Sequence, residues 1–300
     1  MTTTKSKALY LGFVYSTIFG FSFMFTKMTL GSINSIYHLL ALRFLIAFSA
    51  MTLLLLLGVI KVSYKGKKVL RLVPLGLFQP VIYFIFETKG IALVPSSQAG
   101  IMMACIPILV IILAKIFLHE HPSILQILFV ILSVIGAVVI NINSLSTGNL
   151  LGTIFLLIAV LAAAVYSILS RNLSNEFSAV EMTYLMMGFG AVTFNAISSI
   201  LHMKSGEIGN YFEPFTHPSA LIGLLYLGIL SSIVAFFLLN YTLSKVEASK
   251  TAVFANFTTV VSVIAGILLL REHLMVSQVV GGVMILIGVY GAKKASERVD

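Results

Sequence analysis

Residues 94–121 read VPSSQAGIMMACIPILVIILAKIFLHEH, and residues 246–273 read VEASKTAVFANFTTVVSVIAGILLLREH. Each stretch has a stripe of small residues, a long apolar run and a short charged break, and a second apolar run follows to residue 140 or 292. Laid without gaps, the copies share identical residues along their length, among them Val94/Val246, Ser97/Ser249, Glu120/Glu272, His121/His273, Gln126/Gln278 and Gly136/Gly288. The chain therefore contains an internal duplication.

The composition is that of a membrane protein. Hydrophobic residues make up 59% and charged residues 10% of the 300 residues, whereas roughly a quarter of a soluble domain is charged. A membrane-spanning helix needs about 20 apolar residues. Ten such runs are found, at approximately 8–27, 36–58, 72–94, 96–118, 122–143, 149–170, 179–203, 218–241, 248–270 and 274–292. We therefore expect an all-α polytopic membrane protein of ten transmembrane helices, with no soluble domain.

An uncharged turn at residues 143–149 divides the ten runs into two sets of five. We expect a first five-helix repeat at 1–143, a second at 149–292 and a short tail at 293–300. Because five is odd, equivalent helices cross the membrane in opposite directions, so the repeats are inverted. Inverted repeats are typical of secondary transporters, in which one half rocks against the other around a central site.

The net charge of +9 follows the expected topology. With the N-terminus in the cytoplasm, the outside segments hold only Lys27, Lys89, Lys204 and Arg271. The inside segments hold Lys5, Lys7, Lys61, Lys65, Lys67, Lys68, Arg71, Arg171, Lys245, Lys250, Lys293, Lys294 and Arg298. An inside excess is what the positive-inside rule requires. We expect a multi-pass protein of the cytoplasmic (inner) cell membrane with both termini inside, whose charge serves topology and not nucleic-acid binding.

No metal or cofactor is expected. The single cysteine, Cys105, excludes an intramolecular disulfide and a CxxC motif. His119 and His121 flank Glu120, but a metal site needs three or four converging ligands. Glu120 and Glu272 are expected instead to accept hydrogen bonds from the N-termini of the helices that follow them, where negative charge is favoured.

Several motifs resemble one known family. Residues 92–100 read ALVPSSQAG, and Pro107 and Leu118-His-Glu120 follow. Span nine repeats the pattern at residues 247–252 and 270–272, Arg43-Phe44 stands in span two and Phe19-Gly20 in span one. This pattern is similar to the EamA type of the drug/metabolite transporter superfamily. The resemblance implies ten helices in two inverted five-helix repeats around a central cavity, and export of small metabolites.

One departure from the family pattern concerns span nine. Thr259 stands where the family has a proline, so the second central helix is expected to be less kinked than the first, which carries Pro107. Such positions face the cavity in the family, so the departure weakens any transfer of substrate identity.

Arg43 in span two and Glu87 in span three are ionisable groups within the membrane, which are functional candidates by default. Counted at 1.5 Å per residue, both lie roughly 10 Å below the outer face. Four interpretations stay open. The two residues form a structural ion pair, Glu87 is the proton-coupling carboxylate, Arg43 binds a substrate carboxylate, or Arg43 caps helix carbonyls.

Gln79, Tyr83 and Glu87 recur every four residues and form a polar stripe on span three. A polar stripe on an apolar helix faces the bundle interior or a wet cavity. We expect these three residues to contact a substrate cavity, with interhelical hydrogen bonding as the alternative. Tyr15, Phe19 and Tyr166 are candidates for its walls, although aromatic residues also serve as packing surface.

Small residues form matched stripes in spans four and nine, and we assign them to helix packing and gating. They are Ser97, Gly100 and Pro107 in span four, and Ser249, Ala252 and Thr259 in span nine. Asn256 replaces the Ala104 of the first copy with a hydrogen-bonding group near mid-membrane. We therefore expect Asn256, with Asn240 in span eight, to contact the cavity.

Other function classes have less support. The motifs HExxH, GxSxG and Walker A are absent from the sequence, so neither a hydrolase nor a nucleotide-driven pump is indicated. The duplication indicates a secondary transporter that exports a small amino-acid-like metabolite or drug-like solute by alternating access, with proton antiport through Glu87. An uncoupled facilitator and a membrane sensor or structural protein are the alternatives. The sequence leaves open whether the protein is a monomer or a homodimer.

Overall fold

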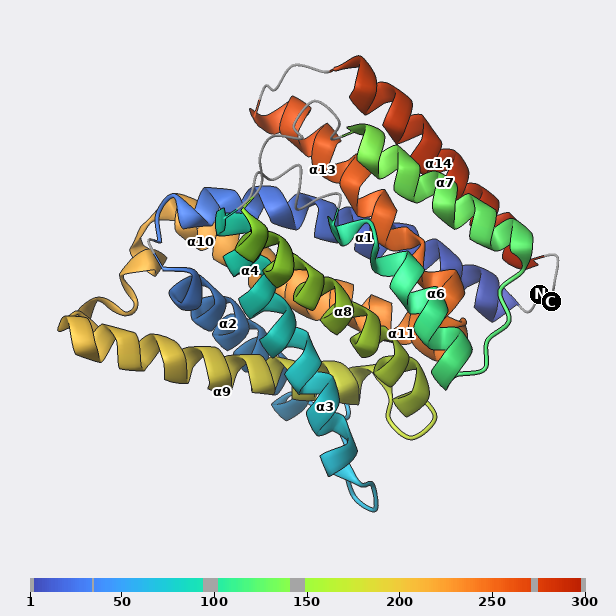
Figure 1. Cartoon of the computed structure of the whole chain (residues 1–300). Helices are drawn as coiled ribbons and strands as arrows, with labels where there is room; N and C mark the ends of the chain where they lie inside the picture. The colour runs from blue at the N-terminus through green and yellow to red at the C-terminus, as the bar shows by residue number, and fades with distance from the viewer. Residues whose placement is uncertain (1–2, 34, 94–101, 141–148, 271–274, 298–300) are drawn as a thin grey trace.

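The computed structural model describes residues 3–33, 35–93, 102–140, 149–270 and 275–297 (Figure 1). Its helices follow the ten apolar runs in order. The first half contains α1 (Thr3–Leu30), α2 (Ile36–Leu56), a composite third span, α6 (Ile106–Phe117) and α7 (Ile124–Ile140). The second half contains α8 (Leu150–Leu173), α9 (Ala179–Ser205), a composite eighth span, a ninth span in two pieces and α14 (Val276–Glu297). The predicted all-α fold is confirmed.

Seven helices of the described part of the chain are long and apolar enough to cross a membrane, judged by length and composition. The helices α6 and α7 are apolar but shorter. At the C-terminus, α14 continues through Glu297, so it includes residues 293–297 of the segment expected to form a tail.

Among the described residues, helix breaks interrupt several spans, including the third, eighth and ninth. The third consists of η1 (Val69–Leu72), α3 (Val73–Gly76), η2 (Leu77–Ile82) and α4 (Tyr83–Leu93). The eighth consists of α10 (Pro218–Leu225), η6 (Tyr226–Ala235) and α11 (Phe236–Lys245), and the ninth of α12 (Ala248–Ala252) and α13 (Phe254–Leu270). The segment η6 is π-helical, and π-helical turns occur frequently at functional sites. The segment η2 instead contains a kink at Gln79.

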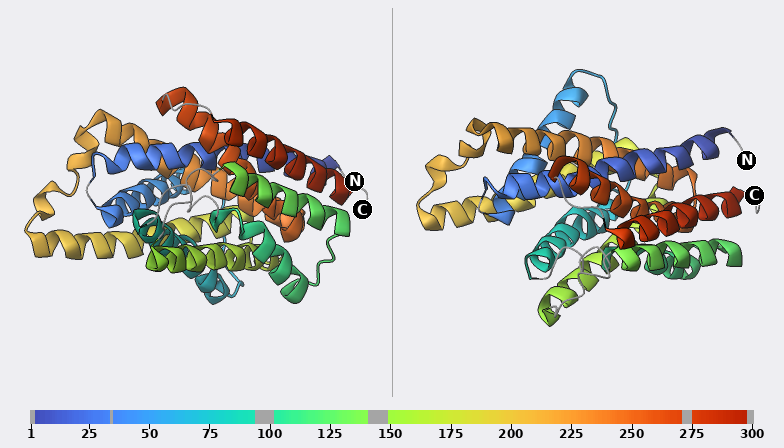
Figure 2. Two further views of the ribbon diagram at one scale, coloured as in Figure 1. Left: turned by 45° about the horizontal axis from the view of Figure 1, so that its top comes forward. Right: turned by 90° about the horizontal axis from the view of Figure 1, so that it is seen from above.

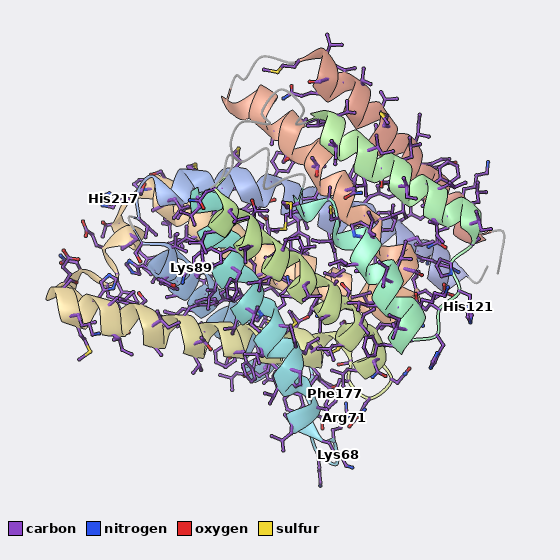
Figure 3. All side chains as sticks on the ribbon, in the orientation of Figure 1. Lys68, Arg71, Lys89, His121, Phe177 and His217 are labelled. Atoms are coloured by element: carbon purple, nitrogen blue, oxygen red, sulfur yellow. The ribbon has the colours of Figure 1, made fainter. Side chains whose placement is uncertain are left out.

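Both termini lie at one end of the bundle (Figures 1 and 2), which we call the terminal end; the other is the distal end. The helix α1 runs away from the terminal end, and its counterpart α8 runs toward it. Figure 3 labels Lys68, Arg71 and His121 on the terminal side of the molecule and Lys89 and His217 toward the distal end.

The helices of the two halves pack against each other. The helix α2 packs on α9, α4 on α8, α1 on α13, and α7 on α14. Each of these pairs joins one helix of the first half to one helix of the second. A cavity at the centre of the bundle is therefore built from both halves.

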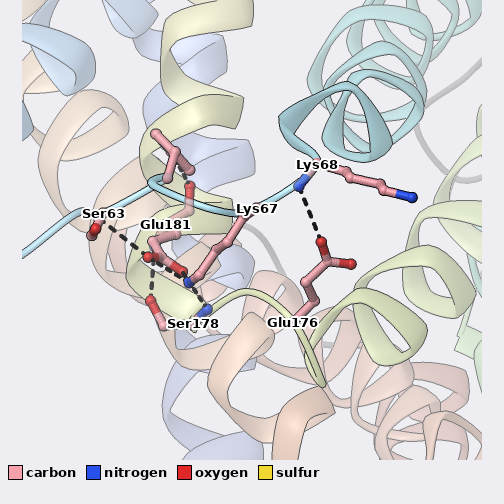
Figure 4. Close-up of polar contacts among 7 residues, drawn as sticks. Ser63, Lys67, Lys68, Glu176, Ser178 and Glu181 are labelled. Atoms are coloured by element: carbon pink, nitrogen blue, oxygen red, sulfur yellow. Dashed lines mark hydrogen bonds and ion pairs between the residues drawn. The ribbon is translucent and has the colours of Figure 1, made fainter.

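The loop after α2 is fastened to the start of α9 (Figure 4). Ser178 and Glu181 form a capping box, which satisfies free N–H groups at the first turn of a helix. The carboxylate of Glu181 also accepts hydrogen bonds from Lys67 Nζ, at 2.6 and 2.8 Å, and from the backbone N–H of Ser63, at 3.2 Å. Beside it, Glu176 accepts from the backbone N–H of Lys68. These bonds hold a loop of the first half against the second half.

The contact between α7 and α14 supplies a stability prediction. A Cβ atom on Gly281 would clash with the carbonyl oxygen of Gly136, whereas a Cβ on the adjacent Gly282 would meet nothing within 4 Å. Overpacking of a tight contact costs about 1–3 kcal/mol. We expect Gly281→Ala to lower the melting temperature of the detergent-solubilised protein by several degrees and Gly282→Ala to leave it unchanged. Equal melting temperatures for the two variants would show that α7 and α14 separate freely.

Candidate functional site

A cavity of about 210 Å³ lies at the centre of the bundle. Residues of α1, α2, η2 and α4 from the first half line it together with residues of α8, η6, α11, α12 and α13 from the second. Its polar or aromatic lining residues are Tyr15, Phe19, Ser22, Thr26, Arg43, Gln79, Tyr83, Phe84, Glu87, Thr88, Tyr166, Ser167, Ser231, Phe236, Thr251 and Thr258. The cavity is thus walled by rings and hydroxyl groups around one cation and one carboxylate.

The cation of the cavity is Arg43 on α2, which is only 4% exposed. Its Nε donates a hydrogen bond to Ser232 Oγ at 2.8 Å, and its Nη2 donates to Ser231 Oγ at 3.0 Å. Its guanidinium carbon lies 4.6 Å from the ring centroid of Phe84, within the range of a cation–π interaction. All three partners are neutral, so the charge of Arg43 meets no opposite charge among them.

The carboxylate of the cavity is Glu87 on α4, which is 8% exposed. The hydroxyl of Tyr83, one turn earlier, donates to Glu87 Oε1 at 2.8 Å. Among the described contacts, Arg43 and Glu87 form no direct ion pair. Both residues also line a smaller extension of about 30 Å³ that runs beside the start of α2. The two groups therefore share one chamber without neutralising each other directly.

Gln79 lines the cavity too, but not as part of a continuous helical stripe. Its backbone is extended, with φ −146° and ψ 119°, because a residue before proline is pushed out of the helical region and Pro80 follows. The helix resumes with Tyr83. The predicted grouping of Gln79, Tyr83 and Glu87 around one cavity agrees with the geometry, although a break separates Gln79 from the other two.

The three aromatic candidates also line the cavity. Tyr15 is buried, and its hydroxyl donates to the backbone oxygen of Thr251 at 3.3 Å. The ring of Phe19 packs edge-on against Phe236 at 5.2 Å. Tyr166 donates to Asn240 Oδ1 at 2.8 Å. These rings both pack against neighbouring side chains and line the cavity, so the cavity-wall and packing interpretations are compatible.

The structure places Asn240 behind the cavity wall, not in it. The side chain is fully buried and accepts from Tyr166 Oη and from Ser170 Oγ, and its Nδ2 donates to Thr183 Oγ1 at 3.0 Å. The amide thereby joins α11 to α8 and α9. Asn240 therefore orients the wall residue Tyr166 and does not itself line the cavity.

Asn256 also lies away from the cavity. Its Nδ2 donates to Ser133 Oγ on α7 at 2.8 Å, so this amide connects α13 to α7. The sequence identified both asparagines as polar groups within apolar spans, but it does not determine which side of a helix faces the cavity.

The residues assigned to packing and gating fall in different places. Ala252 lines the cavity and Thr259 does not, while its neighbour Thr258 does. Pro107 occupies the first turn of α6, where its missing N–H leaves no hydrogen bond unmade. A turn at residues 104 and 105 separates α6 from the helical residues 102 and 103, so the fourth span is interrupted just before this proline. Ser97 and Gly100 lie outside the described residues. The ninth span breaks at residue 253, before α13, and not at Thr259.

A second, polar hollow of about 660 Å³ lies at the terminal end. Its lining includes His119, His121, Arg171, Asn172, Asn175, Glu247 and Lys250. The short helix α12 stands between the two spaces, since Thr251 and Ala252 line the central cavity while Glu247 and Lys250 line the terminal hollow. In this conformation α12 is part of the partition that separates the central cavity from the terminal end.

Glu120 holds this partition in place. Its two carboxylate oxygens accept hydrogen bonds from the backbone N–H groups of Ala248 and Ser249, at 2.8 and 2.9 Å. The prediction that Glu120 caps the helix after it was therefore wrong. Glu120 caps α12 of the opposite half, because the packing of α6 beside α12 brings that helix start closer. Within the described residues, no group of three metal-ligating side chains occurs.

The sequence matches the model of the EamA-like transporter family twice, over residues 6–142 and 150–292. The chain belongs to the EamA-like transporter family. The predicted fold class, an all-α, multi-pass membrane protein, is thereby confirmed, and the two matches to the family model agree with ten helices in two repeats.

Relatives within this family are also named as transporters. The chain is 38% identical to the uncharacterized transporter YcxC of Bacillus subtilis (strain 168), over 96% of this chain and 93% of the relative. It is 28% identical to an uncharacterized transporter of Archaeoglobus fulgidus, over 91% of this chain and 94% of that protein. A protein of known crystal structure superposes with a TM-score of 0.76 at 18% identity, covering 95% of this chain and 98% of that one. The last comparison supports the fold alone.

Sequence reasoning missed several residues around Arg43. Ser22, Ser231 and Phe84 line the cavity. Ser232 does not line it but accepts a hydrogen bond from the guanidinium of Arg43. Serines in an apolar span are ordinarily assigned to helix packing, so their type carries no functional signal. The one available indication of a role at the site was the adjacent pair of serines at 231 and 232. The span that contains them has few other hydroxyl groups at that depth.

Proposed function

We propose that this EamA-like protein is a secondary transporter that exports a small metabolite by alternating access, coupled to proton antiport through Glu87. The observation that supports the proposal most is the central cavity. It lies between the two repeats, and Arg43 and Glu87 line it without forming a direct pair. Inverted-repeat transporters bind their substrates at this place, between the repeats near mid-membrane.

The size of the cavity favours a small metabolite over a drug-like solute. Pockets for drug-sized ligands measure roughly 300–1,000 Å³, and this cavity measures about 210 Å³. The lining combines aromatic rings with one cation and one carboxylate, which suits a compact solute with a charged group and an apolar body. An amino-acid-like compound has this chemistry.

The charge distribution supports cytoplasmic termini in the cell membrane. Among the described residues, the distal end carries Lys89 and Lys204, whereas the terminal end carries Lys61, Lys65, Lys67, Lys68, Arg71, Arg171, Lys245, Lys250, Lys293 and Lys294. Positive residues concentrate on the cytoplasmic side of membrane proteins. The polar hollow at the terminal end is then the cytoplasmic entrance, closed from the cavity by α12.

Reconstituted vesicles test the proposal. Purified protein in liposomes with an imposed pH gradient is given a panel of amino acids, other small carboxylates and cationic dyes, and solute flux and internal pH are both recorded. We expect at least one small solute to move together with protons in the opposite direction. Solute flux without proton movement would establish a facilitator instead, and no flux across the panel would favour the sensor or structural class.

A further inference from the structure

Two adjacent serines hold the guanidinium of Arg43 from one side. Ser232 accepts from Nε at 2.8 Å and Ser231 accepts from Nη2 at 3.0 Å, and neither serine is exposed. Ser22 on α1 donates in turn to Ser231 Oγ at 2.8 Å. A continuous line of hydrogen bonds therefore runs from α1 through η6 to α2.

The local backbone explains how two consecutive residues reach one side chain. In a regular α-helix, neighbouring side chains point about 100° apart, so they do not ordinarily hold the same group. Ser231 and Ser232 belong to η6, whose wider π-helical turns alter this spacing. A Cβ on Gly228 would lie 2.8 Å from Ile46 Cγ2 and 3.1 Å from the backbone oxygen of Arg43, so η6 and α2 approach closely here. The π-helical turn and the glycine together bring both hydroxyls to the guanidinium.

Two of the three guanidinium nitrogens of Arg43 donate hydrogen bonds to protein atoms of the described residues. Nε and Nη2 are used by the serines, and Nη1 donates to no protein atom of the described residues. A charge inside a membrane protein is costly unless it is paired or faces a cavity. The residue lines the cavity, and its hydrogen-bonded partners supply no negative charge. Such an arrangement suits an anion that enters from the cavity.

We propose that Ser231 and Ser232 are positioning residues that hold Arg43 so that its free edge binds the carboxylate of the transported solute. The inference rests on the proposed transport function and deepens it, because it assigns the substrate class as carboxylate-bearing. It also assigns a role to the π-helical turn of η6, which sets the direction in which the guanidinium points.

The proposed carboxylate binding by Arg43 is tested by comparing the binding of acids with that of their amides, which does not require a transport assay. The probes are acetate, benzoate, L-leucine and L-phenylalanine, each compared with its primary amide, and the readout is the ligand-induced rise in melting temperature of the purified, detergent-solubilised protein. We expect at least one acid to stabilise the protein and its amide not to do so. In the Ser231→Ala/Ser232→Ala variant, the apparent Kd of that acid should rise about tenfold or more, since a hydrogen bond to a charged group is worth at least that factor.

Two control variants separate positioning from general stability. Ser198→Ala removes a buried hydroxyl on α9 that contacts His202 and not Arg43, and it should leave the acid's Kd unchanged. The variant Ser231→Thr/Ser232→Thr keeps both hydroxyls and should restore most of the binding. A purely structural role for the serines would lower the melting temperature without probe but preserve the difference between acid and amide.

Three results would overturn the assignment. They are equal stabilisation by acid and amide, no stabilisation by any acid of the panel, and unchanged acid binding in the double alanine variant. Transport of an uncharged solute in vesicles would leave the export function standing while removing the carboxylate, so the two proposals fail separately.

Discussion

Vesicles that contain the Glu87→Gln variant are expected to show no proton movement coupled to solute flux. Glutamine has nearly the same size as glutamate, and its side-chain oxygen can still accept the hydrogen bond that Tyr83 donates to Glu87 Oε1. The variant should therefore fold and insert normally. It lacks only the carboxylate that can take up a proton on one side of the membrane and release it on the other.

The measurement is the internal pH of the vesicles during solute flux, taken at several external pH values. Tyr83→Phe is the complementary control, because it removes the hydrogen bond that Glu87→Gln retains but keeps the carboxylate, and coupling should persist in it. Counterflow exchange of labelled solute, which needs no proton, should survive in Glu87→Gln. Full proton-coupled transport by Glu87→Gln at all pH values would exclude the coupling role.

The second large effect is expected for Arg43→Lys. Lysine keeps the positive charge but loses the planar fork that donates to Ser231 and Ser232. We expect the transport efficiency, kcat/KM, to fall about 10- to 150-fold, because a charge-assisted hydrogen bond to a carboxylate is worth roughly 1.5–3 kcal/mol. Most of the loss should appear as a higher KM, since the change affects binding of the solute.

Initial rates over a range of solute concentrations provide the measurement, and size-exclusion profiles show whether the variant is folded. Lys89→Gln is the control, because this exposed cation lies beyond the cavity on the same half of the chain. If Arg43→Lys transports with unchanged kcat/KM, Arg43 only holds helices together, as the structural interpretation of this residue requires.

The helices could be predicted because the bilayer imposes a length on every span. Apolar runs of that length are visible in the sequence, and the structure has a helical segment at each of them. The breaks inside spans were not predictable in the same way. Pro80 displaces Gln79 from the helix, whereas no proline marks η6, which depends on how the span packs against α2.

The candidate site was predicted in part, and the failures share a cause. Arg43, Glu87 and Tyr83 were identified because polar groups in apolar spans are costly and therefore conspicuous. Asn240 and Asn256 were placed at the cavity for the same reason, but the structure uses both to join helices. A span that is apolar on all sides does not reveal which side faces lipid, a neighbouring helix or the cavity. Only the assembled bundle distinguishes these three environments.

Glu120 connects the architecture to the origin of the duplication. Its carboxylate belongs to the first repeat, and the helix start that it caps, at Ala248 and Ser249, belongs to the second. Such a contact needs no covalent link between the halves. Two separate copies of a single five-helix ancestor, inserted in opposite directions, would have met through the same carboxylate across a subunit interface. The cap of α12 is thus a contact of the kind that two separate chains could share across an interface, here enclosed within one chain.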